Sequence, residues 1–453
     1  MPILIVGAGI AGLTAGEILS RAGKNVVIVE RENEIGGLAR SFSYNNGFSF
    51  DMGPHRFHTN IPDASQYIDQ ILNGDQIRIR RSSSVYFYGR YCCWPLTLLD
   101  VLHLPPLFLF KCTLDLFFKK ATGNDDESFT SYIIKRYGKT IYRHFFENYT
   151  MKFLRLSPDC IHKNWASASI NRAIIDDKII KRSASLFNLT LGMILPKKIE
   201  TTFIYPGSGP NSVFIKKQAG RIKSKGGTIL SKTEVVSFEE SKGSIIRAVL
   251  SNGETVECEE VIFTAPITAL CELLGRPRPC LKFLSTVFFN LVAYGRPKLP
   301  YQWCYFGEKT LIFSRISCMN FFNRKLLPDD DSTALSVELP TYKGDMIWEH
   351  PEKFLNLIIQ DLIRVGYINN FNEIQSFHIE RVENTYPVYE LDYLAELGKS
   401  YKSLEGLRNL WLLGRCGTFW YNNMDHSIKM AIDISNHILN GIHVPVGNYK
   451  LDL

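Results

Sequence analysis

Three glycines and one acid near the start of the chain have the types and spacing of a nucleotide-binding site. Gly7, Gly9 and Gly12 form a Gly-x-Gly-x-x-Gly sequence. Gly7 allows a tight turn, Gly9 leaves room for a diphosphate against the backbone, and Gly12 lets a helix pack closely on a sheet. The carboxylate of Glu30 can accept hydrogen bonds from the hydroxyls of a ribose. Together these residues predict a dinucleotide site.

The elements around these residues have the order that such a site needs. The run Ile3–Val6 is aliphatic and predicts a fully buried strand, and the segment from Ile10 to Ala22 predicts a helix that ends at Gly23. A second aliphatic strand, Val26–Val29, ends at the acid. The free N–H groups and the dipole at the start of the helix favour a bound diphosphate.

Three later stretches also carry residues suited to ligand binding. Residues 48–60 place His55 beside a Gly-Pro turn, which indicates either a loop against a ligand or a structural turn. Arg315 lies in a strand-like stretch, Leu311–Ile316, and its planar fork suits a diphosphate, although a surface arginine on a strand fits the pattern equally well. Residues 409–439 repeat the strand, glycine turn and helix order, so a second helix N-terminus would face the ligand.

The residues after Glu30 indicate which dinucleotide is bound. Gly36-Gly37 and then a basic residue, Arg40, resemble the long FAD fingerprint of the group that contains amine oxidases, phytoene desaturases, protoporphyrinogen oxidases and UDP-galactopyranose mutases. The resemblance implies FAD as the cofactor. In this first part of the chain it implies FAD contacts from Gly7, Gly9, Gly12, Glu30, Arg31, Gly37, Leu38 and Arg40.

Within this group, both ends of the chain resemble UDP-galactopyranose mutases. The Gly-x-His-x-Phe-His-Thr stretch resembles their flavin-facing loop, which implies that His55 lies beside the flavin. Phe313-Ser314-Arg315-Ile316 resembles a motif whose arginine binds the substrate diphosphate, although the acid that usually follows is absent. The catalytic residues implied in this way are His55, Arg315, Arg415 and Tyr421. The further FAD contacts implied are His55, Val236, Gly414, Arg415, Met424 and Asp425.

Two departures near the C-terminus separate the chain from the mutase pattern. Phe419 stands where the pattern has its first tyrosine, and Asn423 stands where it has its first aspartate. Arg415 and Tyr421 keep the matching residue types.

Composition excludes several other classes of protein. The chain has 453 residues and a net charge of +7, which suits an anionic substrate or a membrane surface and is too small to indicate nucleic-acid binding. Its ten cysteines contain no Cys-x-x-Cys pair, so no metal site is expected. Reduced cysteines and a chain that starts on its first strand predict a cytoplasmic protein. The apolar segment 94–118, interrupted by charges and by two prolines, predicts either core or a peripheral membrane contact.

The expected fold is α/β, with a Rossmann-type FAD-binding domain built from discontinuous segments. An inserted substrate domain would hold a mixed or antiparallel sheet and helices. The FAD-binding segments are expected at 1–80, 201–270 and 401–453, a helical and substrate-domain insert at 81–200, and the substrate-domain sheet at 271–400. The aromatic stripe in a long helix over 126–149 is expected to be core, and 205–210 to be a hinge.

Three functions remain open from the sequence. The first is a mutase-like flavoenzyme that acts on a nucleotide sugar through reduced flavin, with NAD(P)H as a possible reductant. The second is an oxidase, desaturase or reductase of an apolar substrate, and the third is a non-catalytic FAD-binding protein. The first two differ in whether an electron donor or acceptor is consumed in each turnover.

Overall fold

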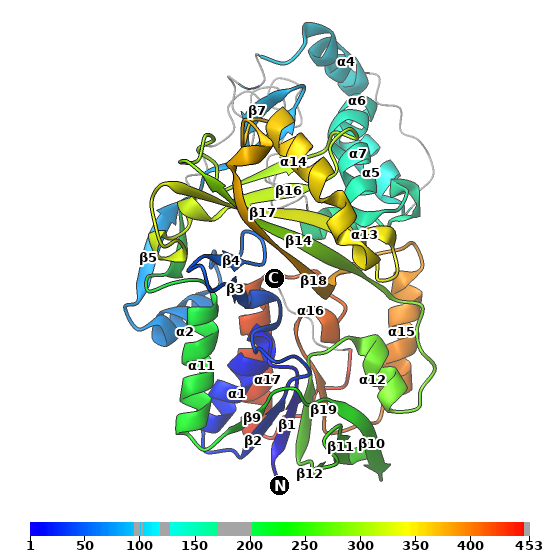
Figure 1. The fold of residues 1–453 in the computed structure, drawn as a ribbon. Helices are drawn as coiled ribbons and strands as arrows, with labels where there is room; N and C mark the ends of the chain where they lie inside the picture. Colours follow the sequence, from blue (N-terminus) through cyan, green and yellow to red (C-terminus); the bar gives the residue numbers. More distant parts are fainter. Residues whose placement is uncertain (95–99, 101–102, 118–126, 170–201, 448–453) are drawn as a thin grey trace.

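The computed structural model describes residues 1–94, 100, 103–117, 127–169 and 202–447. Figure 1 shows an elongated molecule whose two largest sheets lie toward opposite ends, with the chain passing between them several times. The first sheet holds the glycine turn, and the second forms the centre of the expected substrate domain. The site described below lies where the two parts meet.

The first sheet is parallel and is built from segments that are far apart in the sequence. Its strand order is β19-β13-β1-β2-β9. The bounds are Ile3–Val6 for β1, Val26–Val29 for β2, Thr228–Leu230 for β9, Glu260–Phe263 for β13 and Leu410–Leu412 for β19. This is the Rossmann-type arrangement that the sequence predicts, and the aliphatic run Ile3–Val6 is completely buried, as expected.

Both faces of this sheet are covered, because alternate side chains of each strand point to opposite faces. Ile3 and Ile5 pack with the helices α1 (Ile10–Arg21), α2 (Pro62–Leu72), α11 (Ser212–Ser224) and α17 (Met424–Leu439). Figure 1 shows α1, α11 and α17 side by side. Leu4 and Val6 pack in the other direction, with residues of β10 (Val235–Ser241) and β11 (Ser244–Leu250).

The second sheet has seven strands in the order β18-β14-β17-β16-β15-β6-β7 and is mainly antiparallel. Its bounds are Ser83–Phe87 for β6, Arg90–Cys93 for β7, Lys282–Tyr294 for β14, Trp303–Phe306 for β15, Arg315–Cys318 for β16, Ser332–Thr341 for β17 and Ile374–Val388 for β18. Helices α13 (Met346–Glu349) and α14 (Leu355–Arg364) pack on one face. The mixed sheet expected for a substrate domain is therefore present.

The prediction of one long helix over 126–149 is wrong, because the helix is interrupted. Helix α5 (Phe129–Tyr137) ends at Gly138, whose φ is +85°, and the chain restarts as α6 (Lys139–Ile141). A π-helical stretch over Tyr142–Glu147 and then α7 (Asn148–Leu154) follow. The Asp115 carboxylate accepts a hydrogen bond from the Thr140 N–H at 2.5 Å, which stabilises the break. The stripe is nevertheless largely core.

The prediction of a hinge at 205–210 is wrong for its first two residues. Tyr205 and Pro206 belong to β8 (Thr202–Pro206), which pairs antiparallel with β5 (Gln76–Arg80). Tyr205 is fully buried and donates a hydrogen bond to the Asp51 carboxylate. The turn starts only after this strand.

The segment 94–118 lies partly outside the described residues. Its described part forms α4 (Pro106–Phe117), which buries Phe108 but leaves Leu107 64% and Phe110 59% exposed. The expected core role therefore holds for one side of this helix only. Among the described residues, no helix is both long enough and apolar enough to span a bilayer.

Candidate functional site

A cavity of about 890 Å³ follows the carboxyl ends of the strands in the first sheet. Gly7, Glu30, Thr264 and Gly414 line it, and each follows a different strand, namely β1, β2, β13 and β19. The position agrees with the general rule that ligands of open parallel sheets bind at this edge. We refer to it as the large cavity.

The glycine turn leaves the backbone at the start of α1 open to this cavity. Gly9 is the N-cap of α1 and has no side chain to bond the first-turn N–H groups, so they are available to an anion. A Cβ at Gly12 would lie 2.1 Å from the Gly7 carbonyl oxygen, which explains why position 12 needs glycine. The Gly36-Gly37 pair packs on this turn, and a Cβ at Gly37 would lie 3.1 Å from the Gly9 Cα.

Glu30 is held in place by the backbone around it. One carboxylate oxygen accepts from the Ala8 N–H at 2.8 Å, and the other accepts from the Glu32 N–H at 2.9 Å. Each oxygen keeps a further lone pair for a ribose hydroxyl. The neighbouring Arg31 lines the same cavity and forms ion pairs with Glu32 and Glu383.

Most of the residues expected to contact FAD line the large cavity. They are Gly7, Gly9, Glu30, Arg31, Gly37, Leu38, Arg40, His55, Gly414, Arg415 and Met424. Gly12 lies behind the turn, in contact with Gly7 and Ile5. Asp425 is buried at the start of α17 beside His426 and does not line the cavity. Val236 is 47% exposed, and its neighbour Val235 lines the cavity instead.

His55 lies in the loop after β4 (Ser49–Asp51), and its Nδ1 atom is buried without a hydrogen-bond partner among the described residues. Burial and then the charges of Arg415, Arg315 and Arg56 lower the pKa of His55 to about 3, so the ring is neutral at physiological pH. An unpaired buried nitrogen that lines a cavity indicates that a bound group completes its surroundings. A flavin ring, with polar atoms along its edge, is such a group.

A buried network holds the His55 loop against α11. Asp51 accepts hydrogen bonds from the hydroxyls of Ser41 and Tyr205 and from the backbone and side-chain N–H groups of Asn211. The Asn211 side chain also donates to the His55 carbonyl at 2.8 Å. Burial raises the pKa of Asp51 to about 6. Sequence reasoning missed Asp51 and Asn211, because nothing in their local sequence links them.

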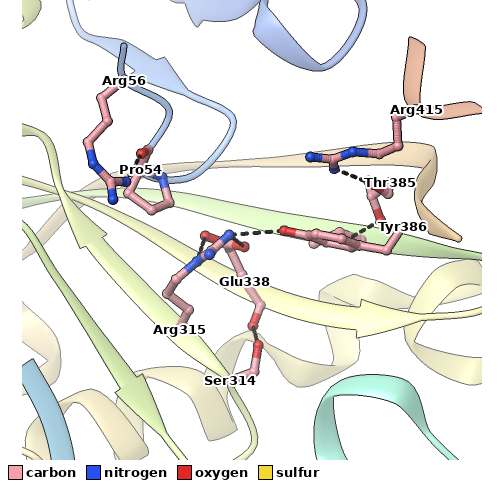
Figure 2. A network of polar contacts seen from close by, with 9 residues as sticks. Pro54, Arg56, Ser314, Arg315, Glu338, Thr385, Tyr386 and Arg415 are labelled. Atoms are coloured by element: carbon pink, nitrogen blue, oxygen red, sulfur yellow. Dashed lines mark hydrogen bonds and ion pairs between the residues drawn. The ribbon is translucent and has the colours of Figure 1, made fainter. Parts of the chain in front are cut away.

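Arg315 and Glu338 are directly opposite each other on β16 and β17. The guanidinium donates from Nε and Nη2 to the two carboxylate oxygens at 2.7 and 2.6 Å, and Nη2 also donates to the Tyr386 hydroxyl at 3.3 Å (Figure 2). Glu338 is 1% exposed. A buried acid on the neighbouring strand is therefore the partner of Arg315. The only signal for Glu338 in the sequence is a single acid within a buried apolar strand.

Within the described part of the chain, the hydrogen bonds of Arg415 go to carbonyl oxygens. It donates to Thr385 at 2.7 Å and to Asn422 at 2.5 Å, and its guanidinium lies 5.1 Å from the ring centre of Tyr386 and 5.2 Å from that of Tyr421. These contacts fix the guanidinium at the border of the large cavity. In Figure 2 the Arg415 side chain extends over the sheet from the side opposite to Arg56.

A second cavity, of about 310 Å³, adjoins this region and is lined mainly by rings. Arg315 and Tyr421 line it, and Tyr421 stacks on Trp165 with ring centres 5.1 Å apart. We refer to it as the aromatic cavity. Its rings come from Tyr86, Phe87, Tyr88, Trp94, Phe145, Phe146, Tyr149, Phe153, Trp165, Tyr305 and Tyr421. The aromatic stripe expected to be core thus also contributes two rings to a cavity wall.

The two departures from the mutase pattern have structural roles. Phe419 has a φ of +51° and is 1% exposed, packed edge-on against Phe283. Asn423 is the N-cap of α17 and forms a capping box with His426. Phe419 therefore belongs to the core, and Asn423 stabilises the helix whose first residue lines the large cavity.

Comparison with solved structures confirms the fold. The structure of reduced UDP-galactopyranose mutase aligns with a TM-score of 0.82 at 21% identity and covers 99% of this chain and 96% of that chain. A putative protoporphyrinogen oxidase from Exiguobacterium sp. 255-15 aligns with a TM-score of 0.74 at 16% identity, covering 96% of this chain and 99% of that chain.

Comparison with curated proteins gives short matches near a tenth of the chain. An inactive all-trans-retinol 13,14-reductase of Danio rerio is 42% identical over 53 residues, which are 12% of this chain and 9% of that protein. A 4,4'-diapophytoene desaturase of Methylomonas sp is 52% identical over 52 residues, which are 12% of this chain and 10% of that protein. The matched segment therefore spans only about a tenth of these relatives.

The family model for flavin-containing amine oxidoreductases matches residues 10–285, which is more than half of the chain. The cofactor is therefore FAD, in agreement with the resemblance seen in the sequence. The large cavity fits it, with an open helix N-terminus for the diphosphate, an oriented carboxylate for the ribose and an unpaired His55 nitrogen for the flavin. This chain belongs to the flavin-containing amine oxidoreductase family.

Proposed function

We propose that this flavoenzyme acts on a nucleotide sugar, or on a related sugar linked to a diphosphate, through reduced flavin. The observation that carries the proposal is an excess of positive charge around His55. Arg56, Arg315 and Arg415 all act on His55 electrostatically, and among the described residues only Glu338 forms an ion pair with any of them. Three guanidinium groups and one carboxylate attract an anionic substrate.

The aromatic cavity supports the same substrate class, because a nucleobase can stack on its rings. Base–aromatic stacking contributes about 1–3 kcal/mol for each base. Tyr421 lines the aromatic cavity, and Arg415, which lines the large cavity, lies over the Tyr421 ring. A ligand in the aromatic cavity would therefore reach the flavin in the large cavity. The fold shared with UDP-galactopyranose mutase, a protein named for a nucleotide sugar, adds support at the level of the fold.

In this proposal FAD supplies a ring that, when reduced, can donate a hydride or act as a nucleophile. The chain supplies the surroundings. His55 stays neutral and presents its Nδ1 atom to the cavity. Arg415 is fixed by two carbonyl groups at the cavity border and stabilises negative charge there. Tyr421 and Trp165 form one stacked wall beside it.

A second function is favoured by the apolar character of the aromatic cavity. Eleven of its eighteen lining residues are Phe, Tyr or Trp, which also suits an apolar substrate of an oxidase, desaturase or reductase. Relatives named as a retinol reductase and a diapophytoene desaturase act on such compounds, although they match only a short segment. The two functions differ in electron balance.

The test is to reduce the purified FAD-bound protein with dithionite or NAD(P)H and supply a panel of UDP-hexoses. Chromatography of the nucleotide sugars measures the conversion. We expect one sugar nucleotide to be converted without stoichiometric use of the reductant. Oxidised enzyme is the matched control and should be inactive. Consumption of one equivalent of donor or acceptor for each apolar product, with no binding of a sugar nucleotide, would establish the second function instead.

A further inference from the structure

Two arginines outside the cavity linings stack on one buried ring. The guanidinium carbon of Arg56 lies 4.2 Å from the ring centre of Trp303, and that of Arg81 lies 5.3 Å from it. Trp303 is completely buried at the start of β15. Arg56 also lies 5.6 Å from the ring centre of Phe203. The two cations are therefore held near each other by aromatic faces, to which guanidinium groups are attracted.

Neither cation is neutralised within the described part of the chain. Arg56 donates from Nη1 to the Pro54 carbonyl at 2.9 Å, and Arg81 donates from Nε to the Ser83 hydroxyl at 2.9 Å. No carboxylate of the described residues forms an ion pair with either. Each guanidinium has five N–H groups, so most of their donors are left for another partner.

Keeping these two half-buried cations together has an electrostatic cost. Burial, and then repulsion from Arg81 and Arg315, lowers the pKa of Arg56 to about 10. Figure 2 shows the Arg56 side chain extending towards the Arg315–Glu338 pair. Glu338 offsets the charge of Arg315, but no carboxylate in the described ranges does the same for Arg56 and Arg81. An anion bound beside them would remove this repulsion.

The position of the two arginines connects them with both cavities. Arg56 follows His55, which lines the large cavity, and the ring that both guanidinium groups face, Trp303, lies two residues before Tyr305 on β15, which lines the aromatic cavity. Arg315, by contrast, already uses two of its nitrogens on Glu338. The free donors that a doubly charged group needs are thus on Arg56 and Arg81 rather than on Arg315.

We propose that Arg56 and Arg81 bind the diphosphate of the substrate, each guanidinium engaging one phosphoryl group. The identity of this ligand rests on the function proposed above. Planar guanidinium forks match phosphate oxygens in pairs, and two adjacent cations match the two phosphoryl groups of a diphosphate. Arg315, paired with Glu338, then only lines the aromatic cavity.

The test uses the FAD-bound full chain and inorganic pyrophosphate as the probe, with binding measured by calorimetry. Arg56→Gln and Arg81→Gln should each raise the dissociation constant about tenfold or more, the loss expected for a charge-assisted contact. Arg78→Gln, which removes an exposed arginine from the neighbouring strand β5, is the matched control and should bind like the wild type. Arg56→Lys and Arg81→Lys should recover part of the affinity.

Retained FAD absorbance and an unchanged melting temperature show that a variant is folded. A folded Arg56→Gln/Arg81→Gln double variant that binds pyrophosphate like the wild type would overturn the site, and so would a wild type that does not bind it. Loss of pyrophosphate binding in the double variant, with no sugar nucleotide converted by the wild type, would keep the site and reject the proposed substrate class. Equal conversion of a sugar nucleotide by wild type and double variant would keep the function and reject the site.

Discussion

Arg315 and Arg415 both contact Tyr386, but their other partners give them different capacities. Arg315 forms a two-point ion pair with a buried carboxylate, whereas Arg415 bonds two neutral carbonyl oxygens and keeps its full positive charge. Removing Arg315 would leave Glu338 buried without its partner, which is strongly destabilising. A loss of substrate binding in Arg315→Ala would therefore not distinguish a binding role from a structural one.

His55 offers a sharper test, because its protonation is coupled to folding. Its pKa is about 3 in the folded protein and about 6.5 in an unfolded chain. As the pH falls from about 6.5 to 3, only the unfolded state takes up this proton, so the wild type loses stability over this window. His55→Gln should lose less stability over the same range. Denaturant unfolding of both proteins at several pH values measures the difference.

The same variant also tests the flavin contact. We expect His55→Gln to retain FAD but to shift the flavin's reduction potential, which a spectroscopic redox titration measures. His58→Gln is the control, because His58 is exposed on the same loop. An unchanged potential together with an unchanged pH dependence of stability would assign His55 no role beyond the loop.

At the scale of elements, the network around Asp51 joins three segments that are distant in the sequence. Asn211, just before α11, bonds both the Asp51 carboxylate at the end of β4 and the carbonyl of His55 in the following loop. Asn211→Ala should lower the free energy of unfolding by about 1–3 kcal/mol, since it leaves buried acceptors unpaired. It should also increase hydrogen exchange in residues 52–58, because the loop loses its anchor.

Asn372→Ala is a suitable control for this experiment. Asn372 is exposed in the turn before β18, where its backbone N–H donates to the Asn370 side chain. This substitution should change the free energy of unfolding by no more than a few tenths of a kcal/mol. It should leave the hydrogen exchange of residues 52–58 unchanged. Unaltered exchange of the loop in Asn211→Ala would mean that the loop is held by other contacts.

The elements also show how far sequence reasoning extends. The glycine turn, Glu30 and the helix after it were predictable, because each depends on residues close together in the chain and on a periodic pattern. The Arg315–Glu338 pair depends on the register between β16 and β17, and the break at Gly138 depends on a carboxylate from α4. Such features follow from tertiary contacts between distant segments, so local patterns do not contain them. The expected roles of the site residues and the expected domain boundaries stay predictions.

At the scale of the whole molecule, α4 lies at the end farthest from the first sheet (Figure 1). Its inner side packs Phe108 against Phe87, Tyr88 and Phe145, all of which line the aromatic cavity. Its outer side exposes Leu107 and Phe110. The helix therefore covers the outer part of the cavity with one apolar side and turns another to solvent.

We predict that this outer side contacts an anionic lipid surface. Lys111 is exposed next to Phe110, and Arg143 is exposed next to His144, whose ring packs edge-on against Phe108 of the same helix. Exposed apolar side chains beside basic ones are typical of a peripheral membrane contact. Fully burying one Leu or Phe contributes about 1.5–3 kcal/mol.

Sedimentation with vesicles tests this prediction. The wild type should bind vesicles that contain phosphatidylserine more strongly than neutral ones, and binding should weaken as salt increases. Leu107→Ser/Phe110→Ser should reduce binding about tenfold or more, whereas Leu357→Ser/Phe371→Ser, which removes an exposed Leu and Phe elsewhere, should not. Equal binding by the two double variants would show that α4 is not the contact. Sugar-nucleotide turnover without vesicles should be the same for both, because neither pair of residues lines a cavity described above.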